Sequence, residues 1–177
     1  MIIRPATRKD SDVLTEISFL AKNYWNYPAQ YFEIWRDELT ITAEYIEKNN
    51  VQVIEDDDRV VGYYSVVKIE KDLKVEGFTL EKGVWLEHLF ILPEFIGKGY
   101  GKRLMQHLLQ NSQKNQWQEL KILADPHSTG FYRKLGARYI QEVPSNIPGR
   151  TVSYLEWITG SRAGVVECLL RLKSGEK

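Results

Sequence analysis

Two hydrophobic periodicities alternate along this chain and predict its helices and strands. In residues 8–25 apolar side chains recur every three or four positions, which predicts an amphipathic helix with Asp10 or Ser11 as its cap. Residues 51–57 and 59–70 are rich in β-branched and aromatic residues and flank the turn sequence DDDR, which predicts a β-hairpin. The first half of the chain is therefore expected to combine helical segments with a β-hairpin.

The same patterns place the remaining elements. Further helices are expected at 28–39, with Pro28 as its first helical residue, at 43–50, with Thr42 as its cap, at 101–116, and within 125–137 up to Gly136. Further strands are expected at 1–6, 84–92, 119–124, 138–143 and 151–158. The polar stretch 71–83 is expected to be a loop.

This order of elements predicts the fold class. Strands alternate with helices only in the second half of the chain, which favours an α/β (α+β) fold rather than a purely parallel, doubly wound one. We expect a mixed central sheet with helices on both faces. Residues 1–158 are expected to form a single domain, and 159–177 a C-terminal tail in which 165–172 can form a short helix.

Charge and composition exclude some classes of protein. Lys plus Arg equals Asp plus Glu, 24 of each, so no excess charge indicates a nucleic-acid or anionic-membrane partner. No run reaches the ~18 apolar residues of a spanning helix, and no secretory signal is visible at the start. The lone cysteine, Cys168, rules out an internal disulfide. We expect a cytoplasmic protein without a membrane partner.

A glycine-rich segment marks the candidate site. Gly97, Gly99 and Gly101 occupy alternate positions, with Lys98 between the first two, where a strand is followed by a helix. Glycine lets backbone N–H groups approach a ligand closely, and a helix N-terminus attracts negative charge, so the segment predicts an anion site suited to phosphate. The alternative is a tight connection with solvated basic residues. The spacing matches neither the P-loop nor the dinucleotide fingerprint, so it does not identify the anion.

Two segments resemble motifs of the GNAT superfamily of acyl-CoA-dependent N-acyltransferases. LFILPEFIGKGYGKRLM is similar to motif A, Gln/Arg-x-x-Gly-x-Gly/Ala, with Gly99 and Gly101 at its glycines and Ile96 in place of the usual Gln or Arg. ADPHSTGFYRKLGARYI is similar to motif B, with Tyr132 at the family's tyrosine and Asp125 where Asn is common. Both motifs occur in the family's order of elements, which spans roughly residues 1–158.

This resemblance implies a GNAT-like, mostly antiparallel sheet of about seven strands and acetyl-CoA as co-substrate. No metal is expected. In the family, backbone amides of motif A bind the pyrophosphate, and a bulged strand before it lets the pantetheine arm lie alongside. The expected acetyl-CoA-binding residues are Leu89, Phe90, Ile91, Gly97, Lys98, Gly99, Tyr100, Gly101, Lys102, Asp125 and Phe131.

The resemblance also implies two catalytic roles. The family's motif B tyrosine protonates the leaving thiolate, a role that falls to Tyr132, and a Glu on the strand before motif A deprotonates the amine, a role for which Glu87 is a candidate. The alternative for Glu87 is an ordinary polar strand residue. His88 is expected on the other face of that strand. A metal site can be drawn from Glu87, His88, Asp125 and His127, but no pair among them has strong metal-ligand spacing.

Aromatic residues gather in the region that covers the acceptor in the resembling family. Phe32 and Trp35, three apart, are best explained as the buried face of a helix. Tyr24, Trp25 and Tyr27 precede Pro28 and suit an amine by cation–π contact. His127 is a further candidate for substrate binding, although a lone loop histidine is often solvated.

The expected function is N-acetylation of a primary amine of a small molecule or peptide by direct attack on the thioester. Two other functions stay open: a non-catalytic acyl-CoA-binding sensor, and an interaction protein that uses the tail from Thr159. Sensors of this type usually lack the motif B tyrosine, whereas Tyr132 is present. No nucleic-acid partner is expected. Many relatives form homodimers, but the sequence leaves the acceptor and the oligomeric state open.

Overall fold

A computed structural model describes residues 1–75 and 77–160 of the chain. Nine strands, five α-helices and two short 3-10 helices lie in these ranges. In chain order they are β1 (Ile2–Pro5), η1 (Arg8–Asp10), α1 (Ser11–Asn23), α2 (Ala29–Leu39), α3 (Ala43–Lys48), β2 (Asn50–Asp56), β3 (Arg59–Ile69), β4 (Leu73–Val75), β5 (Phe78–Leu80), β6 (Gly83–Ile91), η2 (Pro93–Phe95), α4 (Tyr100–Lys114), β7 (Glu119–Ala124), α5 (Thr129–Lys134), β8 (Arg138–Pro144) and β9 (Thr151–Ile158).

Seven of these strands form one sheet, in the order β1-β2-β3-β6-β7-β9-β8, and β4 pairs with β5 in a separate two-stranded sheet. Pairing of β6 with β7 is parallel, whereas the β1–β2, β2–β3, β7–β9 and β8–β9 pairs are antiparallel. The α/β class and the mostly antiparallel sheet of seven strands, expected from the sequence, are thereby confirmed.

The chain divides into two compact units, whose boundaries fall within β3, within β6 and within α4. The first contains Met1–Val67 and Glu87–Leu104, and the second begins with Lys68–Leu86 and resumes at Met105. Each unit thus receives half of β6: Glu87–Ile91 belongs to the first, and Gly83–Leu86 to the second.

In the first unit a hairpin of β2 and β3 packs with the N-terminal helices. Its turn uses Asp57 and Asp58, both in the left-handed region with φ of 47° and 59°, which Asp tolerates better than most residues. Leu14 and Ile17 of α1 are buried, as the helical period predicts. At the start of α3 the Thr42 hydroxyl accepts a hydrogen bond from the Tyr45 N–H at 3.1 Å, so the predicted cap is confirmed.

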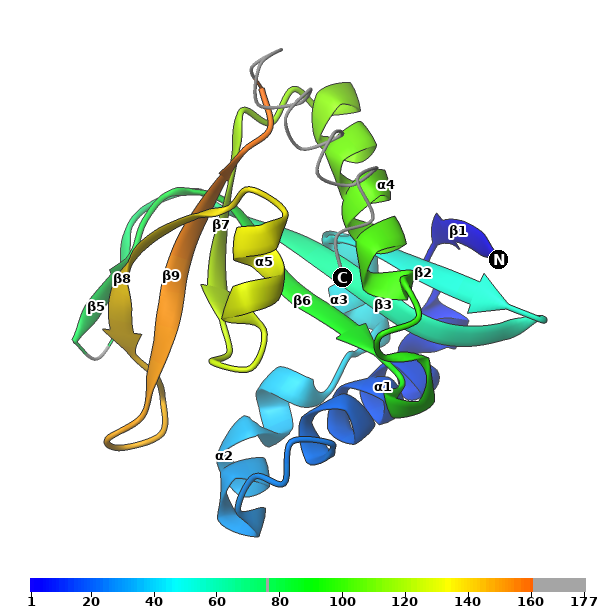
Figure 1. The fold of residues 1–177 in the computed structure, drawn as a ribbon, viewed down its shortest axis with the longest axis horizontal. Helices are drawn as coiled ribbons and strands as arrows, with labels where there is room; N and C mark the ends of the chain where they lie inside the picture. Colours follow the sequence, from blue (N-terminus) through cyan, green and yellow to red (C-terminus); the bar gives the residue numbers. More distant parts are fainter. Residues whose placement is uncertain (76, 161–177) are drawn as a thin grey trace. The chain divides into compact units, whose positions relative to one another are not determined.

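The second unit is built around the strands that follow α4. The first half of β6 pairs with β7 through Trp85 with Lys121 and Leu86 with Ile122. β7 then pairs with β9. β8 and β9 form a hairpin and run side by side in Figure 1. Leu155 and Trp157 of β9 are buried in this unit.

Three local expectations need correction or fall outside the structure. The stretch 71–83 is not a loop, because Leu73–Val75 and Phe78–Leu80 pair as a short hairpin whose turn includes Gly77 at φ 72°. Pro28 is the N-cap of α2 rather than its first helical residue. The helix considered for residues 165–172 lies outside the described residues. Among those described, no helix has the length and apolar character that a bilayer crossing requires.

Candidate functional site

The glycine-rich segment adopts a conformation that needs glycine at two positions. Gly97 and Gly99 have φ of 78° and 89°, in the region that L side chains rarely adopt. A Cβ added to either residue would meet no atom within 4 Å, so the space beside the loop is open. These glycines are therefore required by backbone conformation and not by crowding within the protein.

Helix α4 starts directly after this loop. Its first i to i−4 hydrogen bond joins the Arg103 N–H to the Gly99 carbonyl at 3.1 Å, so the N–H groups of Tyr100, Gly101 and Lys102 precede the helical ladder. N–H groups without an intrahelical partner and the helix dipole both favour an anion at this end. The Lys98 amino group lies 5.5 Å from the centre of the Phe95 ring, so a cation flanks the loop.

Tyr100 contributes differently from the other loop residues. Its side chain is buried, and its hydroxyl donates to Asp56 Oδ2 at 2.5 Å. This hydrogen bond raises the pKa of Tyr100. The side chain therefore anchors the start of α4 to β2, and only the backbone N–H of Tyr100 is suited to a ligand.

Backbone direction in the second half of β6 follows from its contacts with β3. The Leu92 N–H donates to the Val61 carbonyl at 2.9 Å, and the Phe90 carbonyl lies where a Cβ on Gly62 would come within 2.7 Å. Backbone N–H and C=O groups of successive strand residues point to opposite edges, so those of alternate residues share an edge. Phe90 and Leu92 thus face β3, whereas Leu89 and Ile91 direct their N–H and C=O groups to the opposite edge.

Glu87 and His88 meet at one hydroxyl group. The Tyr45 hydroxyl of α3 donates to Glu87 Oε2 and lies 3.2 Å from His88 Nδ1. His88 is buried, whereas the Glu87 side chain is 39% exposed. Burial raises the pKa of Glu87, and the hydrogen bond from Tyr45 opposes that shift. Glu87 and His88 were expected on opposite faces of the strand, but both side chains reach the Tyr45 hydroxyl.

The motif B residues lie in the second unit. Tyr132 of α5 is 6% exposed, and burial, with the charge of Asp125 as a smaller cause, raises the pKa of its phenol. The Asp125 carboxylate accepts hydrogen bonds from Arg150 Nη2 at 2.8 Å and from the His127 N–H at 3.1 Å. Phe131 packs edge-on against Tyr132, with ring centres 5.2 Å apart.

The aromatic residues before α2 form a cluster that already contacts a cation. The Lys22 amino group lies 4.5 Å from the ring centre of Trp35 and 5.9 Å from that of Tyr27. Trp35 is buried, as expected for a core-facing residue of α2, and Phe32 is half-buried. Tyr24 and Trp25 are 47% and 38% exposed and pack edge-to-face. The surface they form suits a positively charged amine.

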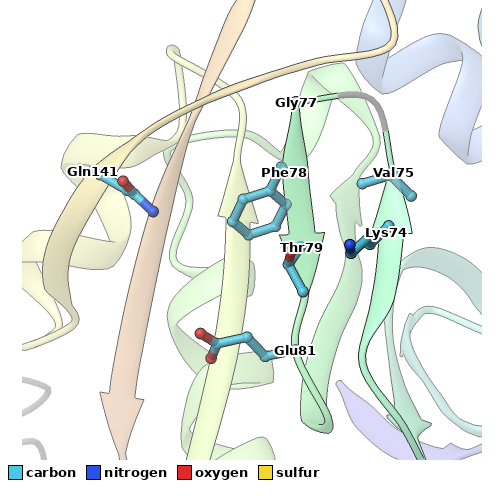
Figure 2. A pocket seen from close by; sticks show the side chains of 7 residues that line it. All are labelled: Lys74, Val75, Gly77, Phe78, Thr79, Glu81 and Gln141. Carbon is cyan, nitrogen blue, oxygen red and sulfur yellow. The ribbon is translucent and has the colours of Figure 1, made fainter.

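A separate cavity of about 460 Å³ lies in the second unit, on the β4–β5 hairpin (Figure 2). Its lining residues are Lys74, Val75, Gly77, Phe78, Thr79, Glu81 and Gln141. The Glu81 carboxylate also accepts a hydrogen bond from Lys121 at 2.7 Å. None of the site residues expected from the sequence lines this cavity.

Two residues that touch this candidate site were missed by sequence reasoning. Tyr45 lies 42 residues before its partner Glu87, and Arg150 lies 25 residues after Asp125. Neither belongs to a motif, and only the folded chain places them together. The single local signal was Thr42, which starts α3 and so fixes where Tyr45 lies on the helix.

A mixed sheet whose central strand leads through a glycine-rich loop to a helix N-terminus defines a class of α/β proteins in which backbone N–H groups at the helix start favour an anion. Within this class, the chain belongs to the acetyltransferase (GNAT) family, whose model matches residues 18–137. The expected superfamily, and at family level the expected GNAT-type acetyltransferase, are confirmed.

Known proteins similar to this chain include the peptidyl-lysine N-acetyltransferase YiaC of Escherichia coli, 26% identical over 110 residues. That alignment covers 62% of this chain and 65% of YiaC, so it spans slightly less than two thirds of the relative.

Solved structures share the fold. A GCN5-related N-acetyltransferase from Rhodopseudomonas palustris is 17% identical with a TM-score of 0.70, covering 88% of this chain and 93% of that one. The PaiA N-acetyltransferase from Thermoplasma acidophilum, solved with coenzyme A, is 18% identical with a TM-score of 0.67, covering 88% and 96%.

Proposed function

We propose that this protein is an N-acetyltransferase that transfers an acetyl group from acetyl-CoA to a primary amine of a small molecule or peptide. Acetyl-CoA, when bound, supplies the acetyl group as a thioester. The observation that carries the proposal is the loop before α4, where Gly97 and Gly99 hold positive φ beside open space and the N-terminus of a helix follows.

The loop has the features that a pyrophosphate group needs. The N–H groups of Tyr100, Gly101 and Lys102 are available at the helix N-terminus, and Lys98 and Lys102 add positive charge. Ile96 offers no polar side-chain contact, so binding in this loop rests mainly on the backbone. The acetyl-CoA role of Gly97–Lys102 is consistent with this donor set.

The edge of β6 that faces away from β3 would hold the acyl end. Leu89 and Ile91 direct their amides to that edge, so one of them would donate to the carbonyl oxygen of the acetyl group as negative charge develops there. Phe90 would contribute its ring alone, because its carbonyl faces Gly62. This division gives Leu89, Phe90 and Ile91, all expected to contact acetyl-CoA, different proposed roles.

Glu87 is the proposed general base. An attacking amine must lose a proton, and the half-exposed Glu87 carboxylate can accept it. A base with a raised pKa holds the proton more readily, and burial raises the pKa of Glu87. Tyr132 is the proposed general acid, because burial keeps its phenol protonated at neutral pH until a leaving thiolate needs a proton.

The acceptor is proposed to be a cationic amine that meets the aromatic surface of Tyr24, Trp25 and Tyr27. Support comes from the contact of Lys22 with the adjoining Trp35 and Tyr27 rings, which is a lysine ammonium on aromatic faces. The similarity to a peptidyl-lysine N-acetyltransferase favours a lysine side chain of a peptide among such amines. His127, exposed at the turn before α5, remains a proposed contributor to substrate binding.

Coenzyme A binding and turnover together test the proposal. The protein would be titrated with coenzyme A by calorimetry, and then assayed with acetyl-CoA and a panel of lysine peptides, polyamines and aminoglycosides with a free-thiol readout. We expect binding, and thiol release that depends on one class of amine. Binding without turnover on any amine would instead support a sensor, and absence of binding would contradict both functions.

A further inference from the structure

The strongest unexplained feature is the hydroxyl group of Tyr45, which joins three polar side chains. It donates to Glu87 Oε2, lies 2.7 Å from Ser65 Oγ, and lies 3.2 Å from His88 Nδ1. Ser65 and His88 are buried. Tyr45 thus links the exposed carboxylate to a buried polar group of the first unit.

His88 fixes the direction of these hydrogen bonds. Its Nε2 lies 3.1 Å from the Glu38 carbonyl oxygen, which can only accept, so Nε2 carries the ring proton. Burial lowers the pKa of His88 to about 4, so the ring is neutral near pH 7 and its Nδ1 is an acceptor. The Ser65 hydroxyl, 2.8 Å away, donates to that nitrogen.

The Tyr45 proton has two possible acceptors. Ser65 gives its own proton to His88, so Ser65 Oγ and Glu87 Oε2 both face the Tyr45 hydroxyl as acceptors. The phenol has one proton, and the ionised carboxylate is the stronger acceptor, which directs that proton to Glu87. Tyr45 from α3 and His88 on β6 contact the Glu87 side chain, whereas burial and, less strongly, the Glu87 charge raise the pKa of Tyr63 on β3, which is therefore neutral where Glu87 titrates. Of these, Tyr45 is the donor to the carboxylate.

We propose that Tyr45 is a positioning residue for the general base: its hydroxyl holds Oε2 of Glu87 in one orientation and leaves Oε1 to accept the proton of the acceptor amine. This inference rests on the proposed function of Glu87. The Ser65–His88–Glu38 chain orients Tyr45 in turn. A carboxylate that is already held by a charge-assisted hydrogen bond loses less conformational freedom in the reaction than a freely rotating one.

The first test needs no substrate. The Glu87 side-chain carboxyl would be titrated by carbon-13 NMR in the full chain, with its signal assigned from a Glu87→Gln variant. In Tyr45→Phe the titration midpoint should move to higher pH, because a donor to the ionised form is lost. Tyr63→Phe is the matched control: it removes a buried hydroxyl with a 2.6 Å hydrogen bond to Ser18, and it should leave the midpoint unchanged.

A midpoint that does not move in folded Tyr45→Phe would overturn the inference. Should Tyr45→Phe fail to fold, Tyr45→3-fluorotyrosine keeps the hydroxyl and makes it a stronger donor. The midpoint should then move to lower pH, and an unchanged midpoint would again contradict a hydrogen bond from Tyr45.

The second test separates this inference from the proposed function. In Tyr45→Phe, kcat/KM should fall about tenfold or more on the acid side of its pH profile, and the acid limb should move to higher pH. Full turnover by Glu87→Gln would reject the proposed base and with it the positioning role. Loss of turnover in Glu87→Gln with an unmoved limb in Tyr45→Phe would reject the role of Tyr45 alone.

Discussion

Burial controls the protonation of three side chains that the proposed chemistry depends on. It raises the pKa of Glu87 and of Tyr132, and it lowers the pKa of His88 to about 4. In each case removal from water disfavours the charged form. The result is an acid that stays protonated, a base that holds a proton more firmly, and a neutral imidazole that can serve as a fixed acceptor.

Replacement of Tyr132 by Phe tests the proposed acid. The change keeps the ring that packs on Phe131 and removes only the hydroxyl. Turnover should fall by about 10²-fold, as for loss of a general acid, whereas acetyl-CoA affinity should change little. Steady-state kinetics and calorimetry would measure both. Turnover within a few-fold of the parent would show that water or another group, such as His127, protonates the thiolate.

The buried His88 should make stability depend on pH. Its folded-state pKa of about 4 lies below the unfolded value of 6.5, so the unfolded chain takes up a proton first as the pH falls. The free energy of unfolding should therefore decrease between about pH 6.5 and 4, by roughly 3 kcal/mol from this group. Urea unfolding across that range would show a flatter dependence in His88→Gln, and equal slopes would contradict the assignment.

At the scale of elements, the close approach of β3 to β6 sets the backbone on which the acyl end is proposed to lie. A Cβ on Gly62 would come within 2.5 Å of Ile91 Cδ1 and 2.7 Å of the Phe90 carbonyl oxygen. The side-chain atom can move, but the carbonyl is part of the strand. Gly62 therefore determines where the second half of β6 lies.

Gly62→Ala should push β6 away from β3. We expect a loss of about 1–3 kcal/mol in the free energy of unfolding, typical of overpacking, together with weaker acetyl-CoA binding. Gly130→Ala is the control, because a Cβ there would meet nothing within 4 Å and Ala favours a helix. If Gly62→Ala is as stable as the parent and binds equally well, β6 does not depend on this contact.

The elements were predictable from sequence wherever a pattern was long. The β2–β3 hairpin and β6 carry strong β-branched and aromatic runs, and Thr42 marks the start of α3. The β4–β5 hairpin was missed because each strand has three residues with polar neighbours, although LKV and FTL around a turn glycine carry a weak hairpin signal. The contacts of the Tyr45 hydroxyl with Ser65, Glu87 and His88 could not be predicted, because they depend on packing between α3, β3 and β6.

At the scale of the whole molecule, the GNAT model matches residues 18–137, a range that includes parts of both compact units. The glycine loop and Glu87 belong to the first unit, and Tyr132 to the second. A ligand that binds only the folded chain stabilises it by mass action. Bound acetyl-CoA should therefore raise the thermal unfolding temperature of the complete protein.

Acetyl-CoA at about 100 times its Kd should stabilise the protein by about 2.7 kcal/mol and raise Tm by about 5–10 °C. In Gly99→Val this increase should be largely lost, because a branched side chain would occupy the open space beside the loop. Gly149→Val is matched to it, with φ of 75° and no atom within 4 Å of a Cβ, and it should keep the increase. An equal increase in both variants would contradict the phosphate-loop assignment.

An enzyme that acetylates amines also carries amines of its own, and the surroundings of Lys121 bear on that chemistry. Its buried ammonium lies 2.7 Å from Glu81 and 3.0 Å from the Tyr154 hydroxyl, with Glu119 at 3.2 Å. Burial alone would lower the pKa of Lys121, but the hydrogen bonds that it donates raise it. Only a neutral amine attacks a thioester, so we expect the carboxylates around Lys121 to make it a poor target for self-acetylation.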